Sequence, residues 1–329
     1  MRAFEFVEPA SLHEVLQLLQ CGAGQARVLA GGSDLLGELK DEVVHYDRLV
    51  SLAAVPGLRD LREESGGLRL GALLTLAQLE YAPRLQGPYR FLAEAARGVA
   101  TPEIRQQGTL GGNLCQRPRC LHYRSGLVSC LKKGGTDCPA IAAPYQNYLS
   151  IMGGQGCFSV HASDLAPPLI ALDAEISLRV LSGARTLPLL DFFVGPEQDM
   201  QRENVLTSSE IVTDVFLPTP PSSWRGTSLK ARERTAGDFP LVSVAVGYAL
   251  TGGLIQQSRI VLGGVAPTPW RSREAEVLLE GQPPSAELAS QAAQVALADA
   301  RPLPHNAFKV EIARTLIARA ILAVAALPR

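Results

Sequence analysis

The chain has 329 residues, of which 47% are hydrophobic and 19% are charged, and this composition excludes disordered, collagen-like and low-complexity proteins. At about 150 residues per domain, the length predicts two domains or three smaller ones. Lysine and arginine number 31 against 32 acidic residues, with no long run of like charges, so no nucleic-acid-binding surface is expected.

Two features bear on membranes and on the compartment. The longest apolar segment, residues 312–327, is interrupted by Arg314 and Arg319 and is too short to span a bilayer. The first residues lack the apolar segment of an export signal, so we expect a cytoplasmic protein without membrane contact. We expect it in the periplasm only if a partner with a twin-arginine signal carries it across.

Short apolar runs and capping signals predict an α/β unit in the first 55 residues. Strands are expected at residues 4–7, 27–30 and 49–52. The pattern Ser-Leu-His-Glu at residues 11–14 is a capping box that opens an apolar helix. Gly31 and Gly32 predict a tight turn, and Ser33 is the expected N-cap of a short helix over residues 34–40.

A second unit is expected over residues 56–217. Its predicted strands lie at residues 68–70, 175–181 and 211–217, and its helices follow Thr75 and span residues 90–97. Between residues 98 and 165 the sequence shows almost no sustained periodicity. Irregular segments of this length are usually functional.

A run of prolines and serines at residues 218–223 predicts a linker. Beyond it, strands are expected at residues 228–233, 241–250 and 259–265, with Gly252 and Gly253 as a hairpin turn. The last sixty or so residues show helical spacing of apolar side chains. An antiparallel sheet covered by helices is the simplest C-terminal domain.

Two glycine-rich loops are the first candidates for a ligand site. Residues 30–34 are Ala-Gly-Gly-Ser-Asp, and residues 108–113 are Gly-Thr-Leu-Gly-Gly-Asn. Neither is a GxGxxG dinucleotide fingerprint, and the first has Glu38 where a P-loop needs lysine. A strand, two glycines and a helix N-terminus present backbone N–H groups that suit a diphosphate. The alternative for this loop is a tight turn without a ligand.

The two loops and their flanks resemble a known pair of motifs. Residues 28–36, Val-Leu-Ala-Gly-Gly-Ser-Asp-Leu-Leu, and residues 101–113, Thr-Pro-Glu-Ile-Arg-Gln-Gln-Gly-Thr-Leu-Gly-Gly-Asn, are similar to the FAD motifs in the flavin subunit of molybdenum hydroxylases. That family includes xanthine dehydrogenases, bacterial aldehyde oxidoreductases, carbon monoxide dehydrogenases and 4-hydroxybenzoyl-CoA reductases. Later blocks similar to the family follow in the same order, at residues 163–167, 239–245, 263–266 and 269–271.

The resemblance implies the fold and the cofactor site. The fold class is α+β, with a vanillyl-alcohol-oxidase-type (PCMH-type) FAD-binding domain of two α/β subdomains, residues 1–55 and 56–217, around an extended FAD. A smaller α+β domain, residues 222–329, follows. The family match implies contacts to the FAD diphosphate and ribityl chain from Ala30, Gly31, Gly32, Ser33, Asp34, Leu35, Thr109, Leu110, Gly111, Gly112 and Asn113.

Three further cofactor contacts follow from the same resemblance, and no catalytic residue does. Asp164 matches a residue that binds a polar group of the cofactor, Val212 an adenine contact, and Lys230 an isoalloxazine contact. On its own, Lys230 is equally consistent with an exposed strand lysine. The chain departs from the family at Gln106, where many members have Asn, and at Ser33, where Thr is common. No His or Cys lies within the loops, so the FAD is expected to be bound non-covalently.

Five of the six cysteines lie close together, in or near an insert at about residues 115–160. The absence of a CxxC pair disfavours a zinc ribbon or finger, whereas four thiolates on a long loop can ligate an iron–sulfur cube. In the 4-hydroxybenzoyl-CoA reductases and one branch of bacterial aldehyde oxidoreductases, a similar segment carries a [4Fe-4S] cluster. That resemblance implies the ligands Cys120, Cys130, Cys138 and Cys157.

Other readings of this region stay open. Cys115 directly follows the second loop and is expected to be a small packing residue. His122 and His161 are alternative ligands, although a lone histidine is more often structural. The alternative for the whole set is buried thiols without a metal. His161, Ser163 and Asp164 do not predict a catalytic triad, because they are so close in sequence and no GxSxG elbow is present.

With the resemblance, these features predict an electron-transfer subunit that holds FAD and a [4Fe-4S] cluster, in a molybdenum-dependent hydroxylase that oxidises aldehydes or N-heterocycles. A large molybdopterin-binding subunit and a small [2Fe-2S] subunit are the implied partners, in a heterotrimer or a dimer of heterotrimers. The alternatives are the flavin subunit of an aromatic acyl-CoA reductase, a stand-alone flavin oxidase, and a metal-stabilised binding protein without a redox role.

Overall fold

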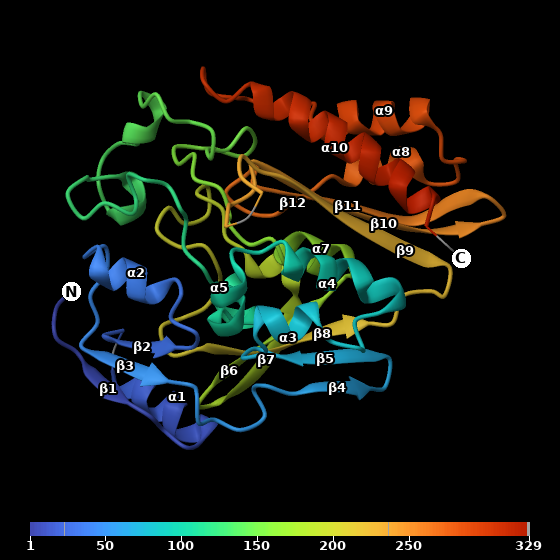
Figure 1. Cartoon of the computed structure of the whole chain (residues 1–329). Coiled ribbons are helices and arrows are strands. Elements are labelled where there is room, and N and C mark those ends of the chain that lie inside the picture. The colour runs from blue at the N-terminus through green and yellow to red at the C-terminus, as the bar shows by residue number, and fades with distance from the viewer. Residues whose placement is uncertain (23, 236, 328–329) are drawn as a thin grey trace.

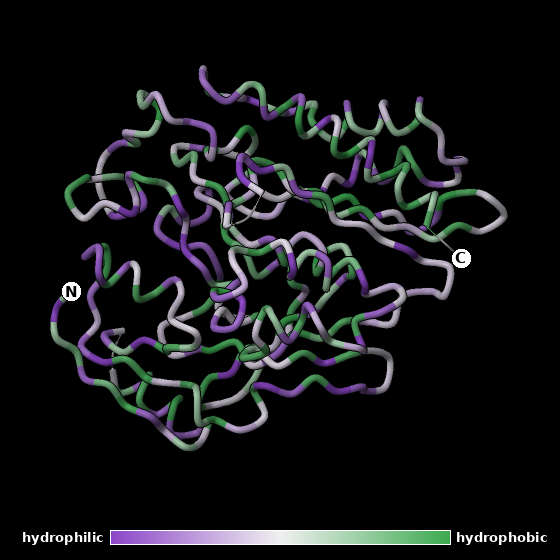
Figure 2. The backbone as a smooth tube through the Cα atoms, viewed as in Figure 1, coloured by the Kyte–Doolittle hydropathy of each residue, from purple (hydrophilic) through white to green (hydrophobic). Residues whose placement is uncertain are grey.

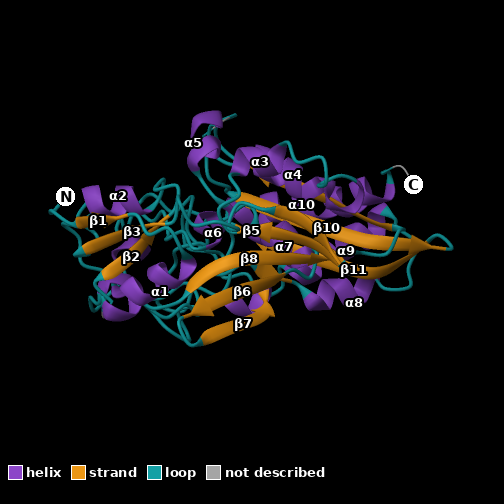
Figure 3. Ribbon diagram, turned by 90° about the horizontal axis from the view of Figure 1, so that it is seen from below, coloured by secondary structure: helices purple, strands orange, loops and turns teal. Residues whose placement is uncertain are grey.

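The described residues form three β-sheets that follow one another along the chain, with three, five and four strands. The structure, a computed structural model, describes residues 1–22, 24–235 and 237–327 (Figure 1). Seen from below, the small N-terminal sheet lies at one end of the molecule, and the two larger sheets lie together toward the other end (Figure 3). In the described residues, no helix has both the length and the apolar character needed to cross a membrane.

The N-terminal sheet is parallel, with the strand order β1-β3-β2. Its elements are β1 (Glu5–Val7), α1 (Leu12–Cys21), β2 (Ala26–Leu29), α2 (Leu35–Lys40) and β3 (Arg48–Ser51). Ser11 caps α1 as predicted, since its Oγ accepts a hydrogen bond from the Glu14 N–H, but the predicted capping box is incomplete, because the Glu14 carboxylate accepts from the Ala10 N–H instead of the Ser11 N–H. The prediction that Ser33 caps α2 is wrong: the N-cap is Asp34, and its side chain makes no cap bond. That carboxylate binds the cysteine-rich insert instead.

The middle sheet is antiparallel, with the strand order β4-β5-β8-β6-β7. Its strands are β4 (Leu61–Glu64), β5 (Gly67–Gly71), β6 (Glu175–Val180), β7 (Gly183–Pro188) and β8 (Ile211–Pro218). The helices of this part are α3 (Leu76–Glu80), α4 (Arg90–Arg97), α5 (Pro102–Gln107), α6 (Leu110–Leu114) and α7 (Ala166–Ala171). The sequence patterns predicted β5, β6 and β8 but missed the edge strands β4 and β7, whose side chains are largely exposed or only partly buried.

The C-terminal sheet is antiparallel, with the strand order β12-β11-β10-β9. Its elements are β9 (Trp224–Ala231), β10 (Val242–Thr251), β11 (Leu254–Gly263), β12 (Trp270–Arg271), α8 (Arg273–Leu279), α9 (Ala286–Ala296) and α10 (Phe308–Ala325). The hairpin turn is confirmed, since Gly252 and Gly253 have φ of +60° and +83°. Helices α8, α9 and α10 cover the outer face of the sheet (Figure 1).

Strand β10 is buried on both faces, and this explains its continuous hydrophobic run (Figure 2). Val244 and Val246 belong to the core shared with α8, α9 and α10. Ala245 and Ala249 belong to a second core, which contains residues of α4, α7 and the middle sheet. The sheet therefore separates two helical layers, and the predicted α+β class is confirmed.

The cysteine-rich insert lies beside the N-terminal end of α10 (Figure 1). Its regular structure is limited to short turns such as Leu131–Lys133 and Pro139–Ile141. The buried Lys309 donates hydrogen bonds to the carbonyl oxygens of Leu149 and Gly264, each at 2.7 Å. The C-terminal part of the chain thereby fixes one end of the insert.

Candidate cofactor cleft and cysteine pocket

The two glycine-rich loops lie against each other, although they are far apart in the sequence. A Cβ atom on Gly31 would lie 1.8 Å from the carbonyl oxygen of Gln107, so only glycine allows this contact. Gly32 has a φ of +71°, which lets the chain turn from β2 into α2. The contact joins the end of β2 to the corner between α5 and α6, and both loops become walls of one cleft.

The cleft consists of two neighbouring cavities with empty volumes of about 900 and about 780 Å³. They share Ser33, Asp34, Thr109 and Gly112. Most of the predicted cofactor residues line the cleft: Ala30, Gly31, Gly32, Ser33, Asp34, Leu35, Thr109, Gly111, Gly112, Asn113, Asp164 and Val212. A dinucleotide is a long ligand, and a two-part cleft of this kind suits it.

The first loop has free backbone donors. Among the described residues, the N–H groups of residues 31–35 donate to no protein acceptor. These groups belong to the turn and to the first residue of α2, where a helix leaves its amides unpaired. Unpaired amides beside a cavity are a suitable site for a diphosphate.

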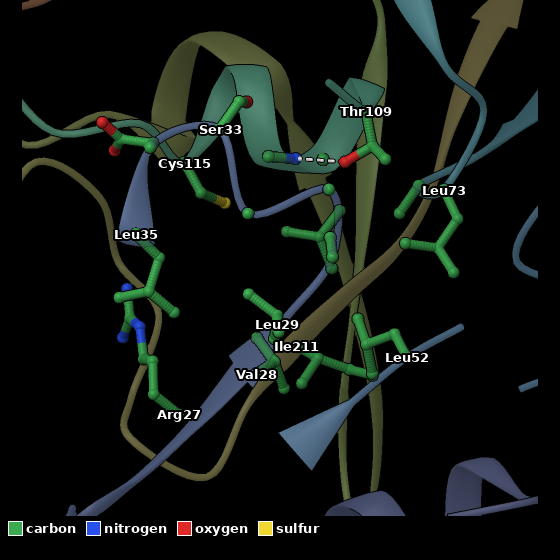
Figure 4. Close-up of a pocket in the computed structure, with 18 of the residues that line it drawn as sticks. Arg27, Val28, Leu29, Ser33, Leu35, Leu52, Leu73, Thr109, Cys115 and Ile211 are labelled. Carbon is green, nitrogen blue, oxygen red and sulfur yellow. Dashed lines mark hydrogen bonds between the residues drawn. The ribbon is translucent and has the colours of Figure 1, made fainter. Parts of the chain in front are cut away.

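The second loop contributes little hydrogen bonding of its own. The N–H groups of Leu110 and Gly111 donate to Leu74 and Ala72, and Thr109 Oγ1 accepts from the Gly112 N–H at 3.1 Å (Figure 4). Leu110 is fully buried in the core and does not line the cleft. Gly111 is packed against the protein, because a Cβ atom there would lie 3.0 Å from the Cβ of Ala72, and Gly112 lines both cavities.

Asp164 presents an unsatisfied carboxylate oxygen in the smaller cavity. Its Oδ2 accepts a hydrogen bond from Lys230 Nζ at 2.7 Å, whereas Oδ1 is buried and has no partner among the described residues. Burial raises the pKa of Asp164 despite the neighbouring ammonium group. A ligand N–H or O–H would satisfy Oδ1, which fits the predicted role in binding a polar group of the cofactor.

Lys230 lies behind Asp164 and outside the lining of the two cavities. Besides Asp164, its Nζ donates to the carbonyl oxygens of Gly98 and Asp238, at 3.0 and 2.8 Å. An ammonium group has three N–H bonds, and all three are used within the protein. Lys230 therefore holds Asp164 in place and does not itself reach into the cleft.

Ser163 supports the second loop and takes no part in a triad. Its Oγ donates to Asn113 Oδ1 at 2.5 Å and accepts from the N–H groups of Leu165 and Ala166 at the start of α7. His161 Nδ1 accepts a hydrogen bond from the Ser163 backbone N–H, at 3.4 Å, and burial lowers the pKa of His161 to about 4. The geometry agrees with the expectation that no hydrolase relay exists here.

The four predicted cluster ligands meet in a separate pocket with an empty volume of about 300 Å³. The residues that line it include Cys120, Cys130, Cys138, Cys157 and His122. The two remaining thiols lie elsewhere. Cys21 is exposed at the end of α1. Cys115 lines the larger cavity of the cleft, and burial raises its pKa to about 12.

Sequence reasoning missed the charged residues between the cleft and the cysteine pocket. Asp34 Oδ1 forms ion pairs with Arg119 and Arg124, at 2.8 and 2.6 Å, and its Oδ2 accepts a hydrogen bond from the Arg117 N–H at 2.8 Å. Asp34 was predicted to contact the cofactor, but both oxygens of its carboxylate already bind residues of the insert. In the sequence, these arginines were marked only by their frequency, with two between Cys115 and Cys120. Such a frequency does not show which acidic residue they bind.

Comparison with known proteins identifies the family. Residues 2–220 match the FAD binding domain in molybdopterin dehydrogenase, and residues 227–324 match the CO dehydrogenase flavoprotein C-terminal domain. The chain is 32% identical over 300 residues to the aldehyde oxidoreductase FAD-binding subunit of Escherichia coli, with 89% of each chain covered. It is 27% identical over 293 residues to the nicotine 6-hydroxylase medium subunit of Paenarthrobacter nicotinovorans, covering 88% of this chain and 86% of that one.

A solved structure agrees with the sequence comparisons. The carbon monoxide dehydrogenase of Hydrogenophaga pseudoflava contains a chain that matches with a TM-score of 0.79 and 27% identity, covering 99% of this chain and 98% of that one. The predicted PCMH-type fold is thereby confirmed. This chain is an FAD-binding oxidoreductase subunit, and it belongs to the family of flavin subunits of molybdenum hydroxylases.

Proposed function

We propose that this chain is the electron-transfer subunit of a hydroxylase that oxidises aldehydes or N-heterocycles, and that it holds a [4Fe-4S] cluster besides FAD. The observation that carries the proposal is the meeting of Cys120, Cys130, Cys138 and Cys157 in one pocket beside the flavin cleft. When bound, the cluster supplies one-electron transfer and the flavin supplies two-electron chemistry. The names of an aldehyde oxidoreductase and a nicotine hydroxylase among the relatives support the substrate classes.

We place the FAD along the cleft, with the adenine in the larger cavity near Val212 and the isoalloxazine ring in the smaller cavity near Asp164. Two features support this orientation. The free N–H groups of residues 31–35 lie between the two ends, where an extended FAD has its diphosphate. Within the part of the chain that the structure describes, Asp164 Oδ1 is a buried acceptor without a partner, and the flavin ring carries an N–H donor.

The chemistry of the cysteine pocket fits a cluster better than a single ion. In the described chain, no group of three or more His, Cys, Asp or Glu side chains is arranged to hold one metal ion. A cube of four irons and four sulfides is larger than one ion and takes four thiolate ligands, and the four cysteines that would hold it all line this one pocket. Burial raises the pKa of both Cys120 and Cys138, so the free thiols stay protonated at neutral pH and ligation would release their protons.

The insert also presents apolar side chains that suit a partner. Leu121, Leu127, Ile141 and Tyr145 are 71%, 99%, 47% and 77% exposed. Exposed large apolar groups gathered in one segment are typical of interaction sites. We propose that the insert contacts a large molybdopterin-binding subunit and a small [2Fe-2S] subunit, in a cytoplasmic heterotrimer or a dimer of heterotrimers. The term medium subunit in a relative's name supports such an assembly.

Metal analysis of the tagged full-length chain, purified without oxygen, tests the proposal. We expect about one FAD, four irons and four acid-labile sulfides per chain, and co-purification of two further chains with molybdenum. The chain without its partners is expected to show flavin and cluster absorbance but no turnover of aldehydes or N-heterocycles. Zinc in place of iron would contradict the cluster, and a molybdenum-free monomer that oxidises these substrates would contradict the subunit role.

A further inference from the structure

A layer of charged side chains separates the flavin cleft from the cysteine pocket. Its cations are Arg117, Arg119, Arg124 and Lys132, and its acids are Asp34, Glu38 and Glu203. Arg119 and Arg124 share one oxygen of Asp34. Arg117 and Lys132 share Glu203, each at 2.7 Å. Each of these two acids therefore serves two cations.

The layer has an excess of positive charge. The third acid, Glu38, accepts a hydrogen bond from the Tyr123 hydroxyl at 2.5 Å, and burial raises the pKa of Glu38 above its ordinary value. Asp34 and Glu203 already have two cations each and leave no carboxylate to balance the remaining charge. A partly buried cation without full compensation is stabilised by any anion that comes near it.

Arg119 is the cation of this layer that reaches the ring end of the cleft. Among the described residues lining the smaller cavity, it is the one arginine or lysine. Its guanidinium lies over the ring of Phe239, 4.9 Å from the centroid, and its Nε is buried without a partner in the described chain.

The acids of the same cavity do not cancel this charge. Asp164 is paired with Lys230 at 2.7 Å, and Asp238 is paired with Arg234 at 2.9 Å. Asp34 is shared between Arg119 and Arg124. Asp164 and Asp238 are thus paired with other cations, and Asp34 offers one carboxylate to two guanidinium groups, so the ring end of the cleft retains an arginine whose charge is only partly compensated and whose Nε has no partner among the described residues.

We propose that Arg119 stabilises the negative charge that the flavin acquires on reduction, and that it thereby sets the reduction potential of the flavin. The inference rests on the orientation of FAD proposed above. The flavin ring takes up two electrons and one proton and then carries one negative charge. The electrons come from the partner chains in the complex, or from dithionite in a titration, and the proton comes from solvent. A preorganised guanidinium lowers the free energy of the anionic form without rearrangement.

Arg119 also links the two sites through the backbone. It precedes Cys120 directly, so one peptide unit joins a residue of the flavin cleft to a residue of the cysteine pocket. Arg124 is the natural comparison. It comes from the same insert and binds the same oxygen of Asp34, but it does not line the smaller cavity.

The test compares Arg119→Gln, Arg119→Lys and Arg124→Gln in the full chain with bound FAD. Two readouts are used: the flavin midpoint potential from a dithionite titration, and the dissociation constant of sulfite, which adds to the oxidised flavin and leaves a negative charge on the ring. For Arg119→Gln we expect the ratio of reduced to oxidised flavin at a fixed potential to fall at least tenfold. This corresponds to a midpoint potential that is lower by about 30 mV for two electrons. We also expect at least tenfold weaker sulfite binding.

The controls separate this effect from others. Arg119→Lys keeps the charge and is expected to recover most of both readouts, and Arg124→Gln is expected to stay within twofold of the original chain. Unchanged values in Arg119→Gln, or an equal loss in Arg124→Gln, would overturn the proposal. If Arg119→Gln purifies without FAD, Arg119→Lys is compared with the original chain instead. A tenfold loss of reduced flavin at a fixed potential, or of sulfite affinity, in Arg119→Lys would also overturn the proposal. Absence of iron from all variants would contradict the cluster but leave both flavin readouts valid.

Discussion

Gly31 packs directly on the carbonyl oxygen of Gln107, and this contact makes one cleft out of two separate turns. Each loop alone connects a strand or a helix to the next helix, which is a common local structure. Together they enclose the junction between the two cavities. Ser33 from the first loop and Thr109 from the second both line the two cavities there. The function of the first loop thus depends on a contact made across the fold.

The first prediction concerns this contact. In Gly31→Ala the new methyl group overlaps the Gln107 backbone, so the two loops must move apart. We expect the free energy of unfolding to fall by about 2 kcal/mol, and FAD occupancy to fall with it. Gly37→Ala is the control, because nothing lies within 4 Å of its Cβ and alanine favours a helix. Full occupancy and an unchanged urea midpoint in Gly31→Ala would show that the loops are not held this way.

The second prediction concerns the buried pair of Asp164 and Lys230. Lys230→Met leaves the carboxylate buried without a counter-charge, and removal of one partner of such a pair costs about 3 to 5 kcal/mol. We expect a loss of this order in urea unfolding, together with weaker FAD binding. Adding Asp164→Asn to Lys230→Met removes the unpaired charge and is expected to restore part of the stability. A double variant as unstable as Lys230→Met would contradict the argument.

The sequence predicted those parts of the fold that depend on local signals. Thr75 forms a full capping box with Gln78, and the helix before Gly98 ends where expected, because both depend on residues within a few positions. Strands β4 and β7 were missed since they lie at the edges of the middle sheet, where one or both faces meet water and no apolar alternation is required. An edge strand of this type forms because it pairs with the neighbouring strand, and the local sequence pattern carries no information about that pairing.

The third prediction is a pH dependence that comes from Lys309. Burial lowers its pKa from 10.5 to about 7 in the folded chain, so between these values the unfolded chain binds more protons. The free energy of unfolding should therefore rise with pH from about 7 to about 10, by up to about 1.4 kcal/mol per pH unit from this group. In Lys309→Met that contribution is absent, whereas the exposed Lys40→Met keeps it. Equal pH profiles for Lys309→Met and the original chain would exclude this contribution.

The fourth prediction separates ligands from other thiols. Cys120→Ala and Cys138→Ala remove residues that line the cysteine pocket, so iron and sulfide are expected to fall to near zero while FAD remains. Cys21→Ala and Cys115→Ala are the controls, because Cys21 is exposed on α1 and Cys115 lines the flavin cleft. Iron content is measured after anaerobic purification. Retained iron in both pocket variants would exclude these residues as ligands.

The candidate site was predictable in its residue types but only partly in its geometry. The glycines, Asp164 and the four pocket cysteines were predicted from motif resemblance, and the cysteines had already been noted for their clustering. Lys230 was expected at the flavin ring, yet its three hydrogen bonds keep it behind Asp164. Arg119 and Arg124 were not identified because their importance depends on Asp34, which lies far from them in the sequence. Charge balance across a fold cannot be obtained from spacing along one chain.

The last prediction concerns the surface of the insert. Leu127 and Tyr145 are 99% and 77% exposed, and burying such side chains against a partner contributes about 25 cal/mol for each Å² of apolar surface. In the double variant Leu127→Asp, Tyr145→Asp, two charges would have to be buried in the proposed interface. We expect the tagged chain to keep its FAD and iron but to lose co-purifying subunits and molybdenum. Val277→Asp is the control, since Val277 is 74% exposed on α8, outside the insert. Full recovery of molybdenum with the double variant would mean that these two side chains do not contact the partners.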